Sequence, residues 1–186
     1  HPDDWITRIP PISMIGTWKN SIATWNRIRR LRHEHGPFDA AYILEQTLVT
    51  FLWRFRSQTP FLLSTDMTPL FCAKRGFWYA VPEFDPSSMP SRAKQAITAS
   101  VYRSAFHMLP WSRAVRDSLI EDYGVPENRV TVLPPGLDLR FWKAPDRQSR
   151  IAQSRKQGFT VLHVGTDPHR KGADLLLALA REPEFQ

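Results

Sequence analysis

The sequence predicts an α/β fold in which a parallel β-sheet is flanked by helices. Short apolar runs typical of buried strands alternate with stretches whose apolar residues recur at helical spacing. A polar cluster, Ser64 to Pro69, directly follows one of these runs, where parallel sheets place ligand-contacting groups. Near the end of the chain the run 160–164 meets Gly165 and a turn, and a leucine-rich buried helix is expected at 173–180. This order is the first half of a βαβ unit.

The composition is that of a globular protein with a basic surface. Of the 186 residues, 42% are hydrophobic and 23% charged, and the formal net charge is +7. No run approaches the roughly 18 apolar residues that a membrane-spanning helix needs. A positive field attracts nucleic acid, anionic membrane surfaces and phosphorylated substrates alike. The chain has no zinc-finger spacing, RNA-binding aromatic signature or lysine-rich tail, so we expect no nucleic-acid partner.

Cysteine and histidine usage argues against disulfide and metal chemistry. Cys72 is the single cysteine, which excludes an internal disulfide and a thiolate metal cluster. It suits a reducing compartment, so we expect a cytoplasmic protein. The six histidines are scattered, and we expect neither a metal nor a cofactor. The chain opens on His1 and Pro2 without a methionine or a signal sequence, and we expect it to be a fragment.

The first predicted element is an amphipathic helix that ends at Gly36. Its apolar residues recur at helical spacing, with cations mostly on the other side, and they are Ile15, Trp18, Ile22, Trp25, Ile28 and Leu31. Tryptophan together with arginine can mean docking on a membrane surface, so peripheral contact with an anionic membrane stays open. A stripe of this kind more often packs against a sheet, and we favour a core role.

Alternating strands and helices are expected to follow. Residues 40–44 are predicted to form a short buried strand, and 61–65 a second strand after Pro60. Between them, 45–57 is predicted to be one helix with an inward face of Leu48, Phe51, Leu52 and Phe55. Residues 70–90 are expected to form an irregular loop rich in aromatic residues and proline. Ser91 is expected to cap a helix with a small-residue inward face, Ala93 to Ala105, before a third strand at 106–109.

In the second half of the chain, Ser112 is expected to cap a helix that Gly124 ends. A strand at 130–133 then runs into Pro135, Gly136 and Asp138, which we predict to be a hinge, since proline stiffens the exit and glycine bends it. We therefore divide the chain into a first domain at 1–134, an interdomain linker at 135–158 and a second domain at 159–186. One strand and one helix cannot bury a core, so we expect the second domain to be truncated.

Two places are candidate functional sites. Arg170 and Lys171 lie in the turn before the helix at 173–180, where unpaired N–H groups and two full positive charges together suit a diphosphate. A solvated basic turn is the alternative. Asp66, at the end of the strand 61–65, is a candidate catalytic carboxylate, although an aspartate in a turn more commonly bonds its own backbone.

Three stretches of the chain, taken together, resemble the sequence motifs of a known protein family. They are Leu109 to Tyr123 (LPWSRAVRDSLIEDY), Val130 to Trp142 (VTVLPPGLDLRFW) and Val161 to Leu179 (VLHVGTDPHRKGADLLLAL). Over about residues 38–182 the chain resembles retaining glycosyltransferases of the GT-B fold, in the large family that includes sucrose synthase and bacterial mannosyltransferases. The resemblance implies two Rossmann-like domains, the first holding a hydroxyl acceptor and the second a nucleotide-diphosphate sugar, with no metal at the diphosphate.

The resemblance also implies roles for single residues. Lys171 matches the family lysine that contacts the donor diphosphate, and Gly165 matches the glycine whose bare backbone lets the phosphate approach. Many relatives carry an arginine where this chain has Thr166, so Arg170 would supply the second charge. Asp66 falls where many relatives place a catalytic-site histidine.

These implications lead to the prediction of a fragment of a glycosyltransferase that moves a sugar from a nucleotide-diphosphate sugar to a hydroxyl with retention. The family's pair of donor-domain glutamates would follow Gln186, so the 186-residue chain itself is expected to be inactive. The alternative is a noncatalytic basic module that binds nucleic acid or anionic surfaces.

Overall fold

The computed structural model describes residues 14–75, 88–143, 146–149, 151–152, 161–165, 168–169 and 171–182. The chain divides into two compact units, His1–Pro135 and Gly136–Gln186. The boundary lies within the sequence that we predict to be a hinge. The assignment of residues 1–134, 135–158 and 159–186 to a first domain, a linker and a second domain remains a prediction.

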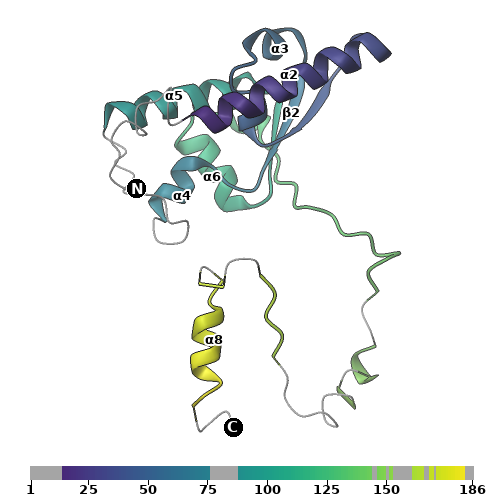
Figure 1. Ribbon diagram of the computed structural model, residues 1–186, viewed down its shortest axis with the longest axis vertical. Helices are drawn as coiled ribbons and strands as arrows, with labels where there is room; N and C mark the ends of the chain where they lie inside the picture. The colour runs from purple at the N-terminus through teal and green to yellow at the C-terminus, as the bar shows by residue number, and fades with distance from the viewer. Residues whose placement is uncertain are drawn as a thin grey trace. The chain divides into compact units, whose positions relative to one another are not determined.

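The first unit is an α/β structure with a three-stranded parallel sheet flanked by helices, which confirms the predicted fold class (Figure 1). Strands β1 (Ala41–Leu44), β2 (Phe61–Thr65) and β3 (His107–Pro110) lie in the order β1-β2-β3. Leu44 pairs with Ser64, and Thr65 pairs with Pro110. The carboxyl ends of the three strands therefore meet at one edge of the sheet.

The core of this unit is centred on β2. Every β2 residue except Leu62 is buried, which is the pattern of a central parallel strand covered on both faces. Buried residues of the other elements pack around Phe61 and Leu63. They include Ile43, Phe55, Val101, Tyr102, Met108, Val115, Leu119 and Tyr123.

Helix α2 (Ile15–His35) forms where predicted and ends at Gly36, whose φ of 85° favours glycine. The predicted core role holds for only part of it, because the buried residues of α2 are Ser21 and Ile28. Its first half exposes large fractions of three predicted core residues, namely Ile15, Trp18 and Ile22. Neither α2 nor any other helix in the described part of the chain has the length and apolarity needed to cross a membrane.

The prediction of one helix over 45–57 is wrong. The segment forms a short 3-10 helix, η2 (Gln46–Leu48), then a turn, then helix α3 (Trp53–Gln58). Thr47, Val49 and Thr50 are β-branched and therefore poor residues for a helix interior. The Thr50 hydroxyl donates to the Gln46 carbonyl (2.8 Å), which stabilises the turn in place of a continuous helix.

The prediction of an irregular loop over 70–90 is wrong at its start, because Pro69–Lys74 form helix α4. The Thr68 hydroxyl accepts a hydrogen bond from the Phe71 N–H (3.1 Å), and Pro69 has no N–H to leave unpaired at the first helical position. Residues 76–87 of the predicted loop lie outside the described residues.

Helix α5 (Met89–Ser104) begins before the predicted cap. Ser88 rather than Ser91 is the N-cap, and the Ser88 hydroxyl accepts from the Ser91 N–H (3.4 Å). The buried face also differs from the predicted one. Val101 and Ala105 are buried as predicted, and Ala99 and Tyr102 are buried beside them, whereas the predicted inward residues Ala93, Ala96 and Ser100 are exposed.

Helix α6 (Arg113–Glu121) agrees with the prediction, with Ser112 as its cap and Gly124 just beyond its end. The predicted strand 130–133 is largely wrong. Val130 pairs with Met108 as an isolated bridge, and the N–H groups of Thr131 and Leu133 donate to β3 carbonyls at 3.0 and 2.9 Å. Two prolines follow directly and have no N–H to donate, so the pairing does not extend.

The second unit contains helix α8 (Ala173–Leu179), as predicted, but α8 is not buried. Leu175, Leu177 and Leu179 are exposed. The buried strand predicted at 160–164 is also wrong for its described residues, because 161–164 are not in a strand, and Val161, Leu162 and Val164 are exposed. A strand needs neighbours for its backbone groups, and no described residue of this unit pairs with 161–164.

Tyr123, after α6, joins this helix to α4. Its hydroxyl accepts a hydrogen bond from the Leu70 N–H (3.0 Å), and its ring lies edge-on to Tyr102 at 4.9 Å between centroids. Burial raises the pKa of Tyr123 to about 12 and that of Tyr102 well above its usual value. Both phenols therefore stay neutral in the folded protein at pH values where they ionise in the unfolded chain.

We expect the free energy of unfolding to fall as pH rises from about 10 to 12. The folded pKa lies above the unfolded one, so the stabilising contribution is complete below pH 10 and is lost as pH rises through the folded pKa. Urea unfolding at several pH values measures this. Tyr123→Phe should make the fall shallower, by about 1.4 kcal/mol for each pKa unit, and Tyr42→Phe, which removes an exposed phenol of β1, is the matched comparison. Equal slopes for the parent and Tyr123→Phe would contradict this assignment.

Candidate functional site

Three side chains follow the carboxyl ends of the three strands. Glu45, Asp66 and Trp111 are the next residues after β1, β2 and β3, and we call them the strand-end cluster. Their backbones are held by sheet-like hydrogen bonds, since the Glu45 N–H donates to the Ser64 carbonyl and the Trp111 N–H donates to the Thr65 carbonyl, both at 3.0 Å. The cluster thus extends the register of the sheet by one residue on each strand.

Asp66 is exposed at the end of β2, and its carboxylate makes no hydrogen bond to another described residue. The turn after β2 is closed instead by Thr65, whose hydroxyl donates to the Met67 carbonyl (2.7 Å). Burial and then the Asp66 charge raise the pKa of the Cys72 thiol. The Asp66 carboxylate is therefore exposed to solvent and does not form the hydrogen bond that closes its own turn.

Trp111 provides an aromatic face at the same edge of the sheet as the two carboxylates. Its indole N–H donates to the Ser64 hydroxyl (2.8 Å), which fixes the ring over β2, while 38% of the residue stays exposed. Ser64 in turn donates to the Leu109 carbonyl (3.2 Å). A partly exposed ring held by a polar anchor can pack against a polyhydroxylated ligand, and carboxylate oxygens at the same sheet edge can accept hydrogen bonds from that ligand.

Glu45 was missed by the sequence reasoning, which placed it at the start of a helix. Its φ is 80°, and no other non-glycine residue in the described part of the chain has a positive φ. Such a conformation is costly for a residue with a Cβ, and strain of this kind concentrates at functional sites. Its carboxylate accepts from the Thr47 hydroxyl (2.9 Å). The signal that could have identified Glu45 is the one that identified Asp66, an acidic residue directly after a strand.

The core of the first unit contains an unsatisfied polar group. Tyr102 is fully buried, and its hydroxyl has no hydrogen-bond partner among the described residues. Its pKa is raised by burial first and also by the charges of Glu45 and Asp66.

In the second unit the structure brings Gly165 and Lys171 together. A Cβ on Gly165 would lie 3.0 Å from Cγ of Lys171 and 3.4 Å from its Cβ, so the lysine stem lies against the bare glycine backbone. A His163 ring nitrogen lies 3.3 Å from the Lys171 carbonyl oxygen and supports the same approach. Gly172 has a φ of 74° and leads into α8. Arg170, the other predicted cation, lies outside the described residues.

The predicted hinge residues lie at the boundary between the two units, which falls between Pro135 and Gly136. Asp138 stabilises the turn that follows. Its carboxylate accepts from the Arg140 N–H (2.9 Å) and guanidinium (3.2 Å), and these bonds lower the pKa of Asp138. The Trp142 N–H donates to the Asp138 carbonyl (2.8 Å).

Among the described residues, no three histidine, cysteine, aspartate or glutamate side chains are grouped so that they could hold a metal ion.

No known protein family matches the chain in a scan against family profiles. Among curated proteins, it is similar to mannosylfructose-phosphate synthase of Agrobacterium fabrum, with 36% identity over 92 residues. The match covers 45% of this chain and 20% of that enzyme, so the chain aligns with about a fifth of the relative's length.

We expect Glu45→Gly to raise the free energy of unfolding by about 1 kcal/mol. Relief of the positive-φ strain should stabilise the folded protein by about 1–3 kcal/mol. The greater conformational entropy of glycine in the unfolded chain should offset about 0.5–1 kcal/mol of this gain. Glu45→Ala is the matched control, because it also removes the carboxylate but keeps the strained backbone. Urea denaturation compares them. If Glu45→Gly is no more stable than Glu45→Ala, the backbone at this position is not strained.

Proposed function

We propose that the protein to which this chain belongs transfers a glycosyl group to a hydroxyl acceptor. The observation that carries the proposal is the similarity over 92 residues to an enzyme whose name describes a mannosyl group joined to fructose phosphate. The parallel sheet with a polar cluster at its carboxyl edge is the kind of framework on which α/β proteins bind ligands. The resemblance to GT-B enzymes in the three sequence stretches points the same way.

The donor in this proposal is a nucleotide-diphosphate sugar that binds through its diphosphate to the turn around Gly165 and Lys171. The bond between the anomeric carbon and a diphosphate oxygen breaks during transfer, so negative charge builds up on the departing diphosphate. A lysine ammonium stabilises that charge, and Gly165 lets a phosphate oxygen come close to the backbone. Arg170, one residue before Lys171, supplies a second cation.

The acceptor binds at the strand-end cluster in the first unit. Its hydroxyl oxygen forms the new bond to the anomeric carbon and loses its proton. Asp66 orients that hydroxyl and accepts its proton, and Glu45 and Trp111 hold the remainder of the acceptor through hydrogen bonds and ring packing. The sugar is transferred with retention of configuration, as the resemblance implies. Pro135, Gly136 and Asp138 form the hinge between the acceptor and donor parts.

We expect Lys171→Ala to lower donor-dependent kcat/KM by about 10- to 150-fold in the full-length protein that contains these residues. A hydrogen bond to a charged group contributes about 1.5–3 kcal/mol, and each 1.4 kcal/mol is about tenfold. The assay measures release of nucleoside diphosphate from nucleotide sugars with a panel of hydroxyl acceptors. Arg170→Ala should be measured beside it, and Lys143→Ala, an exposed lysine outside the turn, is the control.

If both Lys171→Ala and Arg170→Ala stay within about twofold of the parent, the turn does not bind the donor diphosphate. Stability should change by less than about 0.5 kcal/mol, because Lys171 is exposed.

We expect the 186-residue chain by itself to show no glycosyl transfer in the same assay. In the described part of the second unit, both 161–165 and α8 are largely exposed, which offers a donor an open turn rather than an enclosed site. Turnover by the 186-residue chain would contradict this expectation.

A further inference from the structure

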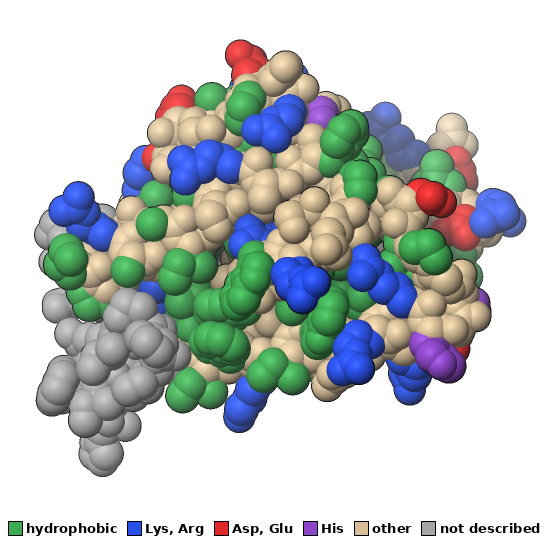
Figure 2. Space-filling view, turned by 90° about the horizontal axis from the view of Figure 1, so that it is seen from above, with side chains coloured by type: hydrophobic (Ala, Val, Ile, Leu, Met, Phe, Trp, Pro, Cys, Tyr) green, Lys and Arg blue, Asp and Glu red, His purple; other side chains and the backbone are tan. Residues whose placement is uncertain are grey.

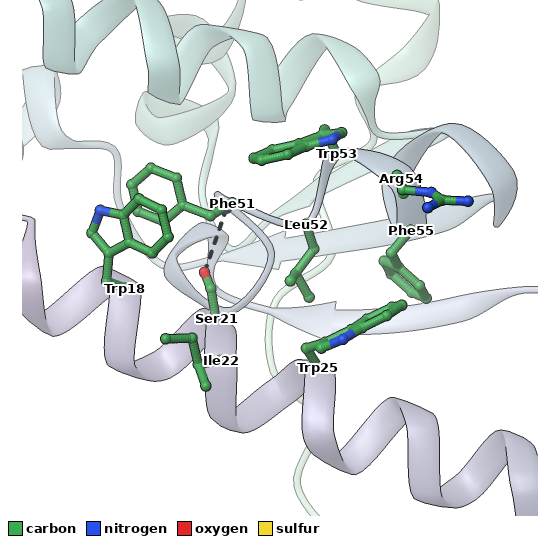
Figure 3. A pocket seen from close by; sticks show the side chains of 9 residues that line it. All are labelled: Trp18, Ser21, Ile22, Trp25, Phe51, Leu52, Trp53, Arg54 and Phe55. Atoms are coloured by element: carbon green, nitrogen blue, oxygen red, sulfur yellow. Dashed lines mark hydrogen bonds between the residues drawn. The ribbon is translucent and has the colours of Figure 1, made fainter.

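Helix α2 and the segment from η2 to α3 form a tryptophan-rich surface that the proposed transfer reaction does not use. A cavity of about 220 Å³ opens between them (Figure 3). We call its main lining residues the tryptophan surface, and they are Trp18, Ile22, Trp25, Phe51, Trp53 and Arg54. In Figure 3 the Trp18 and Phe51 rings lie beside each other, while Trp53 and Arg54 project from the neighbouring segment.

The tryptophan surface is built into the fold. The Trp18 and Phe51 rings stack with centroids 4.1 Å apart and an angle of 14° between their planes. Ser21 of α2 is buried, donates to the Thr47 carbonyl (3.0 Å) and accepts from the Phe51 N–H (3.4 Å), which joins α2 to the neighbouring segment. Trp18 and Phe51 are therefore held in place before any partner binds, which lowers the entropic cost of docking.

This surface exposes more apolar area than a core-facing helix should. Trp53 is 64% exposed, Ile22 54% and Trp18 42%. Scattered apolar residues on a surface are ordinary, but a contiguous aromatic group around a cavity marks an interaction site. The sequence pattern of α2 favoured a core role for Trp18 and Ile22. Because both are exposed, packing in the core does not account for apolar side chains at these positions.

Cations lie on the same elements as the apolar residues, Arg29 on the apolar side of α2 and Arg54 in the lining of the cavity, while the other cations of α2 lie mostly on its opposite side. Lys19, Arg27, Arg29, Arg30 and Arg54 are all exposed, and no ion pair between described residues neutralises any of them. Figure 2 looks onto the end of the molecule that carries α2 and α3, and it shows hydrophobic side chains gathered with lysine and arginine side chains around them, while acidic side chains lie toward the edges of the view. The partner of this surface must therefore be both apolar and anionic.

We propose that the tryptophan surface docks on an anionic lipid bilayer. Trp18, Ile22 and Trp53 enter the boundary between headgroups and acyl chains, where the amphipathic indole ring is favoured. Lys19, Arg29 and Arg54 contact anionic headgroups at the same level. A second copy of the chain does not fit, because a symmetric contact would bring the same cations face to face in a molecule of formal charge +7.

Vesicle binding of the 186-residue chain tests this proposal without any sugar, so its result is independent of the transferase assignment. Cosedimentation compares vesicles of phosphatidylcholine alone with vesicles in which about one third is phosphatidylglycerol. We expect binding to the anionic vesicles only, weakened by added salt. Tryptophan fluorescence should be quenched by brominated acyl chains, because the rings reach the acyl boundary.

Variants locate the contact. Trp53→Ala should reduce the partition coefficient at least tenfold, and Arg29→Ala with Arg54→Ala by about 25-fold, or about fivefold for each cation. The matched control combines Phe106→Ala and Arg113→Ala, an exposed aromatic residue and an exposed cation of the first unit outside this surface. It should bind like the parent. Circular dichroism establishes that each variant used in the comparison is folded.

Three outcomes would overturn the proposal. These are equal binding to neutral and anionic vesicles, surface variants that bind anionic vesicles like the parent, and a dimer in solution that Trp53→Ala dissociates. The last outcome would assign the surface to self-association. Anionic-selective binding that is lost in the surface variants and kept in the control supports bilayer docking.

Discussion

The parallel pairing of β2 with both of its neighbours is the constraint on which the first unit depends. Parallel strands cannot be joined by tight turns, so the chain must cross over through η2 and α3, and then through α4 and α5, before each new strand. These crossovers cover β2 with apolar side chains. The same pairing brings the ends of all three strands to one edge, which is why Glu45, Asp66 and Trp111 become neighbours.

The two candidate sites depend on different kinds of structure. The strand-end cluster joins residues that are far apart in the sequence, and its geometry comes from sheet register and from the Ser64 hydroxyl that holds the Trp111 indole. The contact between Gly165 and Lys171 joins residues six positions apart and is made within one turn. The first site is therefore as rigid as the core around it, whereas the second lies on an exposed segment.

The apolar stripe of helix α2 is buried in the core along one half of the helix and exposed along the other. Ile28 reaches the core, and Arg32 donates to the Thr59 hydroxyl (2.8 Å), so the second half is fixed to the sheet side of the unit. The first half lies over η2 and the turn after it, where Ser21 takes the buried position. With the predicted 45–57 helix broken into η2 and α3, a cavity lies between α2 and residues 51–55, and Trp53 is exposed.

The sequence by itself determined the α/β class, the three sheet strands to within one residue, the Ser112 and Gly124 boundaries of α6, the existence of α8, and Asp66 as a strand-end carboxylate. These features follow from local periodicity and capping. Only the tertiary structure decided the exposure of 161–164 and α8, the divided burial of α2, and the place of Glu45 and Trp111 beside Asp66. Burial and neighbourhood depend on which elements pack together, and side-chain spacing along one segment carries no information about that choice.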